Sequence, residues 1–317
     1  MTHATVTRRK DFLSVLDFDA TELDHCLDLA IQMKADRTLG PDAPTAQLLR
    51  GRYVAMLFDK PSLRTRTTFE IAVRDLGGEV IGLQSDVALG WREPGTDVAR
   101  NLERWVHAVV IRTFSQTALQ EFAAAAGRLH VVNALTDTEH PCQAIADFVT
   151  LKEKLGPLAG RTLAFVGDGN NIAASLAHAS ALLGVHFHMA SPDGYQLPHK
   201  VVQQSTSAAR RKARLRLFTD PADAVAGADA VYTDTWTSMG QEAEADVRRQ
   251  VFAAYQVNDE LMSAAKPGAL FMHCLPAHRG EEVTSGVLES EASIVFDQAE
   301  NRLHGQKALL AMLLGSR

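Results

Sequence analysis

Short apolar runs alternate along the chain with segments of helical length. Seven of these runs predict buried strands, at residues 53–58, 80–83, 109–111, 162–166, 185–190, 230–233 and 269–272. The runs are continuous rather than alternating, which is typical of parallel strands covered by helices on both faces. The pattern therefore predicts an α/β fold with parallel sheets.

Helical periodicity fills the intervals between these runs. Apolar residues recur at i, i+3, i+4 and i+7 over residues 69–76 and two glycines follow, which predicts a helix that ends there. A second helix is predicted from His140 to about Leu155, with a proline in its first turn and a glycine after it. Strand–helix–strand order of this kind is typical of a doubly wound sheet.

A break in the pattern divides the chain. At residues 155–161 the sequence Leu-Gly-Pro-Leu-Ala-Gly-Arg interrupts the alternation, and the length of 317 residues fits two domains better than one. We therefore predict two doubly wound, Rossmann-like domains joined by bridging helices. The first would span residues 1–146 and the second residues 147–299, and a last helix at 300–317 would pack back on the first.

Composition limits the classes of partner. The formal net charge is −6 and the pI is near 6.1, which argues against nucleic acid as the main partner. No apolar run is long enough for a membrane span, and no apolar stretch follows the basic start, so no signal peptide is expected. The three cysteines lack zinc or disulfide-framework spacing, which favours a reducing compartment and no metal. We expect a soluble cytoplasmic protein without a cofactor.

An anion-binding site is predicted where the first strand ends. Ser62, Arg64 and Thr65 lie between that strand and the helix that follows it. The free N–H groups and the positive end of a helix in this position attract phosphate. The hydroxyls and the planar guanidinium add further donors, although Ser62 by itself would also fit a simple helix cap.

Other candidate side chains lie at the ends of further predicted strands. Arg112 comes directly after the run at 109–111, and His140 and Gln143 lie at a later strand-to-helix junction. Because the carboxyl ends of parallel strands share one edge of a sheet, we expect these side chains to gather there. A single histidine in such a position would more often be a cap or a packed side chain.

Three segments together resemble the signature motifs of the carbamoyltransferases. They are Ser62-Leu-Arg-Thr-Arg66, His140-Pro-Cys-Gln143 and His273-Cys-Leu-Pro276. They occur in the order and at the spacing of the family, and the resemblance extends from about residue 53 to residue 307. The family usually has threonine where Leu63 stands, so one hydroxyl is absent, but the N–H of Leu63 can still donate.

The resemblance implies a set of roles. The residues that would hold carbamoyl phosphate are Ser62, Leu63 through its N–H, Arg64, Thr65, Arg112, His140, Gln143 and Arg302. Of these, Arg64, Arg112 and His140 would also stabilise the reacting oxyanion and the departing phosphate. The family further implies a homotrimer, or a multiple of one, in which a loop of a neighbouring subunit enters the site. The corresponding segment here is about residues 85–91.

A fourth motif indicates the acceptor amine. The segment Asp234-Thr-Trp-Thr-Ser-Met-Gly240 is similar to the Asp-x-x-x-Ser-Met-Gly loop of the ornithine carbamoyltransferases. Asp234 would offer a negative partner to the α-ammonium of ornithine, and Ser238 and the N–H of Met239 would offer donors. The resemblance assigns Asn171 to the carboxylate end of the amino acid. An aspartate acceptor would instead need arginines and lysines here.

Several alternatives stay open at this point. N-acetylornithine and N-succinylornithine lack the free α-ammonium that Asp234 would bind, and putrescine lacks the carboxylate that Asn171 would bind. A non-catalytic relative is a further alternative. An NAD-dependent dehydrogenase is another, because residues 167–171 partly match a dinucleotide loop, although Ile172 stands where its third glycine belongs.

Cys274 and Leu275 follow the last predicted strand, at an edge where functional residues collect. We assign both to the carbamoyl phosphate site, with the thiol and the Leu275 carbonyl beside the δ-nitrogen of ornithine. Our hypothesis is that Cys274 orients or deprotonates the amine without forming a covalent intermediate. The alternative is that it is a small buried hydrophobic residue.

Overall fold

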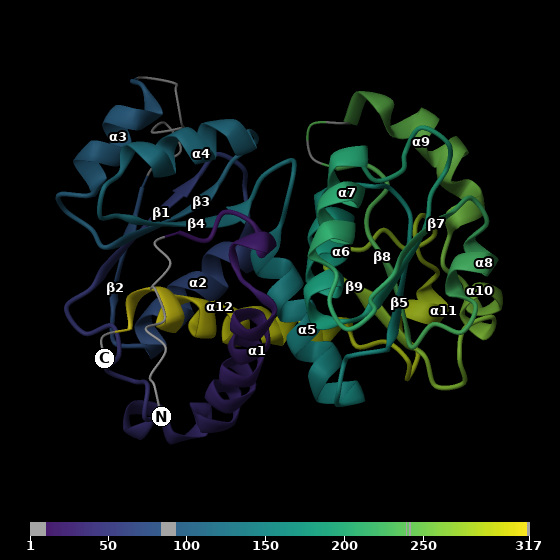
Figure 1. Ribbon diagram of the computed structural model, residues 1–317, viewed down its shortest axis with the longest axis horizontal. Helices are drawn as coiled ribbons and strands as arrows, with labels where there is room; N and C mark the ends of the chain where they lie inside the picture. The colour runs from purple at the N-terminus through teal and green to yellow at the C-terminus, as the bar shows by residue number, and fades with distance from the viewer. Residues whose placement is uncertain (1–10, 84–92, 239, 241, 316–317) are drawn as a thin grey trace. The chain divides into compact units, whose positions relative to one another are not determined.

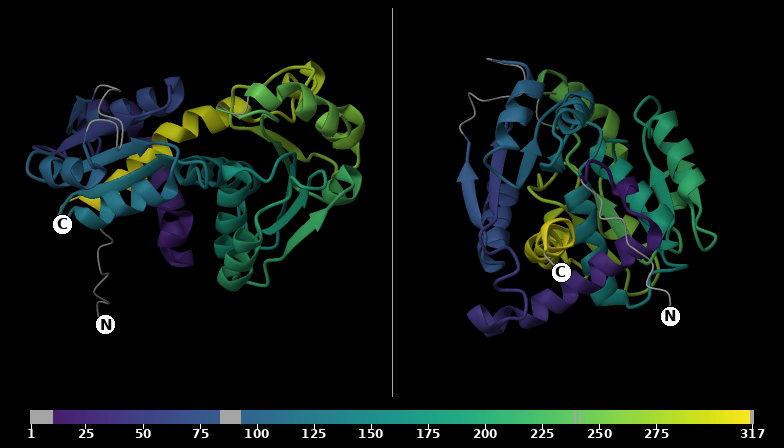
Figure 2. Two further views of the ribbon diagram at one scale, coloured as in Figure 1. Left: turned by 90° about the horizontal axis from the view of Figure 1, so that it is seen from above. Right: turned by 60° about the vertical axis from the view of Figure 1, so that its left-hand side comes forward.

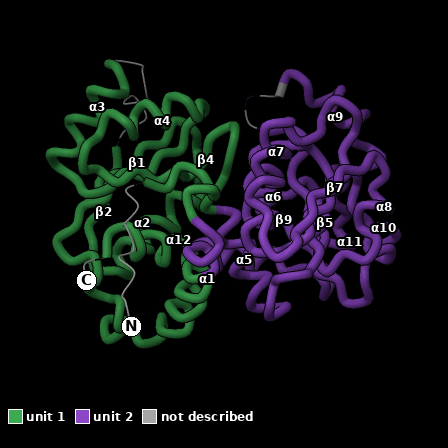
Figure 3. The backbone as a smooth tube through the Cα atoms, viewed as in Figure 1, with its two compact units in different colours: residues 1–18, 25–142, 303–317 green, residues 19–24, 143–302 purple. Residues whose placement is uncertain are grey.

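The computed structural model describes residues 11–83, 93–238, 240 and 242–315 (Figure 1). They form two compact units (Figure 3). Unit 1 draws its described residues from Met1–Phe18, His25–Cys142 and Leu303–Arg317, and unit 2 consists of Asp19–Asp24 and Gln143–Arg302. One boundary, between Phe18 and Asp19, comes just before α1 (Ala20–Ala35). The others fall inside α1, α5 (Pro141–Leu155) and α12 (Val295–Leu314).

Unit 1 is built on a parallel sheet of four strands in the order β2-β1-β3-β4. The strands are β1 (Tyr53–Phe58), β2 (Glu79–Gly82), β3 (Ala108–Arg112) and β4 (His130–Leu135). The helices that lie wholly in this unit include α2 (Leu63–Asp75), α3 (Gly95–Leu102) and α4 (Gln116–Ala125). Short 3-10 segments occur at Val15–Asp17 and Asp36–Asp42.

Helices cover both faces of the unit 1 sheet, as continuous apolar strands require. On one face, Leu57 and Ile111 from the strands pack into one core with Leu102 of α3 and Phe122 of α4. On the other face lie α2 and the end of α12, which is yellow in Figures 1 and 2. The sheet edge at which the strands end therefore remains available to position a site.

Unit 2 is built on a parallel sheet of five strands in the order β7-β6-β5-β8-β9. The strands are β5 (Thr162–Val166), β6 (His186–Ala190), β7 (Leu215–Phe218), β8 (Ala230–Thr233) and β9 (Leu270–His273). The helices are α6 (Asn171–Leu183), α7 (His199–Ala208), α8 (Pro221–Val225), α9 (Ala245–Phe252), α10 (Asp259–Ser263) and α11 (Ser285–Leu288). Figure 1 shows α6 and α7 on one face of this sheet, with α8, α10 and α11 on the other.

The predicted α/β class with two doubly wound parallel sheets is confirmed. Two strands within the described residues, β4 and β7, were not predicted. Asn133 interrupts the apolar run of β4, and its buried amide donates to the carbonyl of Leu13 at 2.9 Å. β7 lies at the edge of its sheet, where Arg216 is exposed and the strand has no continuous apolar run. No helix in the described part of the chain is long and apolar enough to cross a membrane.

Candidate active site

In unit 1 the first predicted motif forms a capped helix start. Ser62 adopts an extended conformation and its hydroxyl accepts from the N–H of Thr65 at 3.2 Å. This contact fixes the first turn of α2 and directs the N–H groups of the turn toward the loop that follows β1. Leu63 is 79% exposed, so its side chain does not pack in the core, and its backbone N–H can donate to a ligand.

The sheet register places Arg112 beside this helix start. Phe58 at the end of β1 pairs with Arg112 at the end of β3, and Arg112 in turn pairs with Leu135 at the end of β4. Arg112 is only 7% exposed. Its permanently charged guanidinium is therefore held at the edge where three strands end, as the sequence predicted.

His140 lies at the same edge of the unit 1 sheet. It is 5% exposed and follows a tight turn in which the N–H of Thr136 donates to the carbonyl of Glu139 at 2.9 Å. The thiol of Cys142 donates to the carbonyl of Asn133 in β4 at 3.2 Å, which ties the start of α5 to that strand. Unit 1 thus brings the Ser62 segment, Arg112 and His140 to adjoining strand ends.

Lys60 is a further cation at this edge that the sequence interpretation did not single out. Its side chain is buried, its ammonium lies 2.6 Å from the carboxylate of Asp137, and it stands 3.9 Å above the ring of Phe114. In sequence it is one of many lysines, and only the fold reveals its burial. It ties the loop after β1 to the loops after β3 and β4, which stabilises the arrangement of strand ends.

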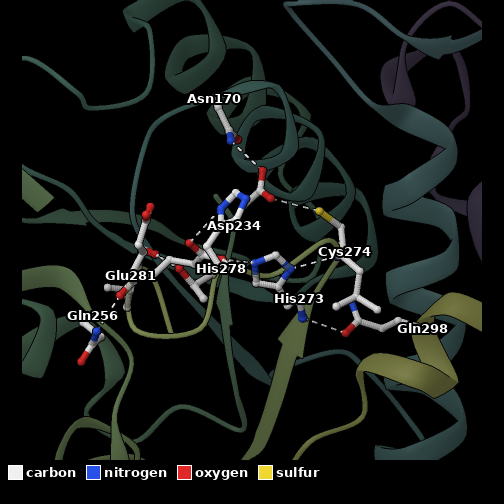
Figure 4. A network of polar contacts seen from close by, with 12 residues as sticks. Asn170, Asp234, Gln256, His273, Cys274, His278, Glu281 and Gln298 are labelled. Carbon is white, nitrogen blue, oxygen red and sulfur yellow. Dashed lines mark hydrogen bonds and ion pairs between the residues drawn. The ribbon is translucent and has the colours of Figure 1, made fainter. Parts of the chain in front are cut away.

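In unit 2, Asp234 lies directly after β8 and is 8% exposed. One carboxylate oxygen accepts from the amide of Asn170 at 2.8 Å, and the other accepts from the thiol of Cys274 at 3.1 Å (Figure 4). The loops after β5, β8 and β9 meet here because those three strands are neighbours in the sheet. Unit 2 therefore presents one buried carboxylate, held on both sides, at its own strand ends.

Asn170, which the sequence interpretation did not single out, contacts Asp234. Its side-chain oxygen caps α6 by accepting from the N–H groups of Ile172 and Ala173 at 3.0 and 3.1 Å, which turns its NH₂ group toward Asp234. The sequence signal was the pattern of a polar residue just before a helix. Asn171 is the first residue of α6 and is half-buried.

The same loop is not arranged for a dinucleotide. The N–H groups of Ile172 and Ala173 in the first turn of α6 donate to the side chain of Asn170, and Ile172 stands where a dinucleotide loop has its third glycine. Gly169 is needed for another reason, because a Cβ there would lie 2.4 Å from the backbone carbon of Gln196. Its small size serves close packing between two loops, which argues against the NAD-dependent alternative.

The thiol of Cys274 stays protonated. Burial, followed by the charge of Asp234, raises the pKa of this thiol well above its ordinary value. The thiol therefore acts as a hydrogen-bond donor to Asp234 and is not available as a base at neutral pH. Of the two roles in our hypothesis, this environment favours orientation over deprotonation.

Leu275 is held in a strained conformation next to this thiol. Its φ is +57°, which is unusual for a residue with a branched side chain. Its N–H donates to Nδ1 of His273 at 2.9 Å, so the other ring nitrogen carries the proton and faces Glu282 at 3.2 Å (Figure 4). Glu282 is fully buried and also accepts from the N–H of His278 at 2.5 Å. This chain of contacts fixes the direction of the backbone beside Cys274.

Arg248 of α9 anchors the loop that contains Asp234. Its guanidinium donates to the carbonyl of Trp236 at 2.5 Å and to the carboxylate of Asp168, and it lies 4.9 Å from the ring of Tyr195. Arg248 is 3% exposed. Burial raises the pKa of Asp168, and the guanidinium opposes that rise. Neither residue was predicted, because each is remote in sequence from its partner.

Gln143 and Arg302, both assigned to carbamoyl phosphate, are in contact within unit 2. The Arg302 guanidinium donates to the side-chain oxygen of Gln143. Both residues are buried, at 1% and 3% exposure. The amide of Gln143 in turn donates to Asp147 at 2.7 Å.

Two parts of the predicted site lie outside the described residues. They are Met239 and the segment 85–91 that was expected to enter a neighbouring site. Ser238 is described and half-buried, four positions after Asp234.

Two groups of side chains bring together the residue types that bind metals. They are Asp234 with His273 and Cys274, and His278 with Glu281 and Glu282. In the first group the thiol is protonated and the histidine nitrogens are engaged by Leu275 and Glu282. Both groups belong to the hydrogen-bond network described above.

Asp147 is fully buried and is held by three hydrogen-bond donors, and its burial affects the pH dependence of stability. Burial raises its pKa to about 6, although hydrogen bonds from Gln298, Gln143 and Tyr232 oppose the rise. The folded protein therefore binds a proton near pH 6 that the unfolded chain, with a pKa near 3.8, does not bind until lower pH. We expect the stability of the wild type relative to Asp147→Asn to increase by about 1 kcal/mol as the pH falls from 7 to 5. Denaturant melts at both pH values would measure it, and an unchanged or falling difference would contradict it.

Comparisons with known proteins agree with this geometry. Residues 10–153 match the family model of the aspartate/ornithine carbamoyltransferase carbamoyl-P binding domain, and residues 159–313 match that of the Asp/Orn binding domain. The chain is 49% identical over 308 residues to an ornithine carbamoyltransferase of Thermosynechococcus vestitus, covering 97% of this chain and 96% of the relative. It is 48% identical over 313 residues to that of Symbiobacterium thermophilum, covering 98% and 99%.

A solved ornithine carbamoyltransferase from Pyrococcus furiosus superposes with a TM-score of 0.92 at 44% identity, covering 97% of this chain and 98% of that one. Another from Thermus thermophilus superposes with a TM-score of 0.86 at 42% identity, covering 97% and 100%. Both halves of the sequence thus match one family in order and over nearly their full length, and the chain belongs to the aspartate/ornithine carbamoyltransferase family.

Proposed function

We propose that this protein transfers the carbamoyl group of carbamoyl phosphate to the δ-amine of L-ornithine, giving L-citrulline and phosphate. The observation that supports this acceptor most directly is the setting of Asp234. It is a buried carboxylate that Asn170 and Cys274 hold at the ends of three strands, which suits a cationic α-ammonium. A dicarboxylate such as aspartate would be repelled there. The relatives named above are ornithine carbamoyltransferases.

Carbamoyl phosphate would be held mainly by cations and backbone donors. We assign to it Ser62, Leu63, Arg64, Thr65, Arg112, His140, Gln143, Cys274, Leu275 and Arg302. The capped start of α2 supplies N–H groups, and the register puts Arg112 beside it. Ornithine would bind Asn171, Asp234, Ser238 and the N–H of Met239.

The transfer step follows from what each group can do. An alkyl amine has a reference pKa of about 10.4, so a desolvated pocket is needed to favour its neutral form. The amine lone pair attacks the carbamoyl carbon, and the C–O bond to phosphate then breaks. Phosphate leaves with the electron pair and takes up the proton that the nitrogen loses. No acyl-enzyme is formed.

Protein groups stabilise the charges that develop during this step. Arg64, Arg112 and His140 would stabilise the oxyanion and then the departing phosphate. The Cys274 thiol, which remains protonated, would orient Asp234 and the amine, and the Leu275 carbonyl would accept from the δ-nitrogen.

The assembly and the compartment are also proposals. We propose a homotrimer, or a multiple of one, with sites shared between subunits, since the family implies this arrangement. All three cysteines are free, which favours a reducing compartment such as the cytoplasm. Light scattering on a gel-filtration column would test the first proposal, and a monomeric mass would contradict it.

An amine panel tests the proposed reaction. Carbamoyl phosphate would be supplied with ornithine, N-acetylornithine, putrescine, lysine or aspartate, and carbamoylated product and phosphate would both be measured. We expect ornithine to be preferred over each other amine by about 100-fold or more in kcat/KM. N-acetylornithine and putrescine each leave a buried polar group unpaired, lysine is one methylene too long, and aspartate has no side-chain amine. No activity with any amine, or a preference for another one, would contradict the proposal.

Arg248 provides a test of how the ornithine loop is held. Arg248→Met removes the contacts to Trp236 and Asp168 but keeps much of the packing against Tyr195. We expect the KM for ornithine to rise about 10-fold while the KM for carbamoyl phosphate changes less than twofold, as loss of a hydrogen-bonded loop anchor misplaces Asp234.

The matched control is Arg249→Met on the same helix. Arg249 is half-exposed and pairs only with Asp246 among the described residues, so its loss should change neither constant. Equal effects of the two substitutions on the KM for ornithine would show that the charge of α9 determines this KM, and that the contacts of Arg248 with Trp236 and Asp168 do not.

A further inference from the structure

Asp147 is a buried carboxylate that we did not assign to the site, and it contacts side chains on α5, α12 and β8. Asp147 lies on α5 and is 0% exposed. Its Oδ1 accepts from the side-chain amide of Gln143 at 2.7 Å and from that of Gln298, on α12, at 2.9 Å. Its Oδ2 accepts from the hydroxyl of Tyr232, on β8, at 3.2 Å.

A carboxylate oxygen facing two amides fixes which way each amide points. An ionised carboxylate only accepts, so both glutamines must turn their NH₂ groups toward it and their oxygens away. The oxygen of Gln143 accepts from Arg302, and the oxygen of Gln298 accepts from the buried N–H of His273 at 2.9 Å. If either amide were reversed, it would place NH₂ against another donor.

The two glutamines lead to different parts of the proposed site. Gln143 and Arg302 are assigned to carbamoyl phosphate. His273 precedes Cys274 and Leu275, and its backbone N–H is the group that Gln298 holds (Figure 4). One oxygen atom therefore determines the orientation of groups on α5, on α12 and at the end of β9.

We propose that Asp147 is a positioning residue: its Oδ1 orients Gln143 and Gln298, and through them the Arg302 guanidinium and the strand end that bears Cys274. This inference rests on the proposed function for its activity readouts. It names a residue that we assign to neither substrate.

The charged and titratable groups around Asp147 come from several elements. They are Tyr232 from β8, Cys274 after β9 and Arg302 from α12. Burial raises the pKa of Asp147 above its ordinary value, so the protein retains this acid at a cost in stability. That cost is expected of a residue kept for its geometry.

Two substitutions separate the acceptor oxygen from the charge. Asp147→Asn keeps Oδ1, with its NH₂ turned toward the Tyr232 oxygen, so we expect kcat/KM for carbamoyl phosphate within about fivefold of the wild type. Asp147→Leu removes the acceptor at similar volume, so we expect a loss of about 100-fold, on the scale of a misplaced binding group. The KM for carbamoyl phosphate should rise about 10-fold and that for ornithine less than threefold.

Gln298→Met provides a second variant if Asp147→Leu does not fold. It breaks only the link to the His273 N–H and leaves the Asp147–Gln143–Arg302 contacts in place. We expect a fall in kcat of about 10-fold with no change in the KM for carbamoyl phosphate. A rise in that KM as large as the fall in kcat would overturn the proposed division between the two glutamines.

Thr150→Val is the matched control, because it also removes a buried hydrogen-bonding group from α5. The Thr150 hydroxyl donates to the carbonyl of Ala146 and accepts from Asn301, away from both glutamines. It should lower the melting temperature without changing kcat or either KM.

The proposal is overturned if Asp147→Asn and Asp147→Leu are equally active, or equally inactive, while both are folded. The wild-type citrulline assay distinguishes this failure from a failure of the proposed function. If the wild type forms citrulline and the variants behave alike, only the positioning role of Asp147 is wrong. If the wild type forms none, the proposed reaction itself is wrong, and the positioning role falls with it.

Discussion

Arg64→Ala is expected to lower kcat/KM for carbamoyl phosphate by about 100- to 1,000-fold, the usual effect of removing one preorganised donor to a developing charge. Arg64 lies in the first turn of α2, directly after the Ser62 cap, where the helix end already favours an anion. Its side chain is only half-buried, so the truncation should leave the fold intact. Steady-state kinetics and a thermal melt would measure both effects.

Arg74→Ala is the control for this substitution. Arg74 is an exposed arginine in the last turn of the same helix, about 15 Å along the helix axis from Arg64. Its loss removes the same charge from the protein but not from the helix start. Near-normal kinetics of Arg64→Ala, or an equal loss in Arg74→Ala, would remove the proposed phosphate site.

Asp234→Asn should have the second large effect, a fall of about 100- to 1,000-fold in kcat/KM for ornithine. The substitution removes the buried negative charge proposed for the α-ammonium while preserving the shape of the side chain. The new amide could still accept from Asn170 through its oxygen, but its NH₂ group would then replace the oxygen that accepts from the thiol of Cys274. The KM for carbamoyl phosphate should change less than threefold.

The choice between ornithine and N-acetylornithine provides a second test of the role of Asp234. Because Asp234 is proposed to recognise the α-ammonium, the variant should discriminate less between ornithine and N-acetylornithine. Asp220→Asn is the control: Asp220 caps α8 at the surface, and asparagine caps a helix equally well. Full activity of Asp234→Asn with ornithine would show that the acceptor amine binds elsewhere.

The sheets could be predicted because their strands are continuous apolar runs. β1 and β5 were predicted at their observed bounds for this reason. β7 could not be predicted in the same way, since an edge strand is covered on fewer sides and tolerates exposed Arg216 and Leu217. β4 contains Asn133, whose cost of burial is offset by a hydrogen bond that is formed across the fold.

The residues of the candidate site that lie at the carboxyl ends of strands could be predicted from the sequence, because ligands of α/β proteins bind at this edge of the sheet. Ser62, Arg112 and Asp234 lie at the ends of strands or shortly after them, so their sheet edges follow from the order of elements alone. The contact between Cys274 and Asp234 also follows once β8 and β9 are known to be neighbours. The identity of the acceptor amine came from the motif at residues 234–240, because the position of Asp234 at a strand end does not by itself indicate which amine binds there.

The supporting residues could not be predicted. Arg248 lies 80 positions from Asp168 in sequence and Gln298 lies 151 positions from Asp147, so no local pattern links either pair. Asn170 was not predicted, because its contact with Asp234 joins two loops that lie far apart in sequence. Such contacts depend on side-chain packing that periodicity does not encode.

The central proposal is that Arg64 and Arg112 of unit 1 bind carbamoyl phosphate and that Asp234 of unit 2 binds the α-ammonium of ornithine. A crystal structure with a phosphonoacetyl-ornithine analogue would test it most directly. We predict that the phosphonate oxygens lie within hydrogen-bonding distance of the Ser62–Thr65 turn and Arg112, with the α-ammonium on Asp234. An analogue bound with Arg64 and Asp234 both turned away from it, in unconnected places, would contradict the claim.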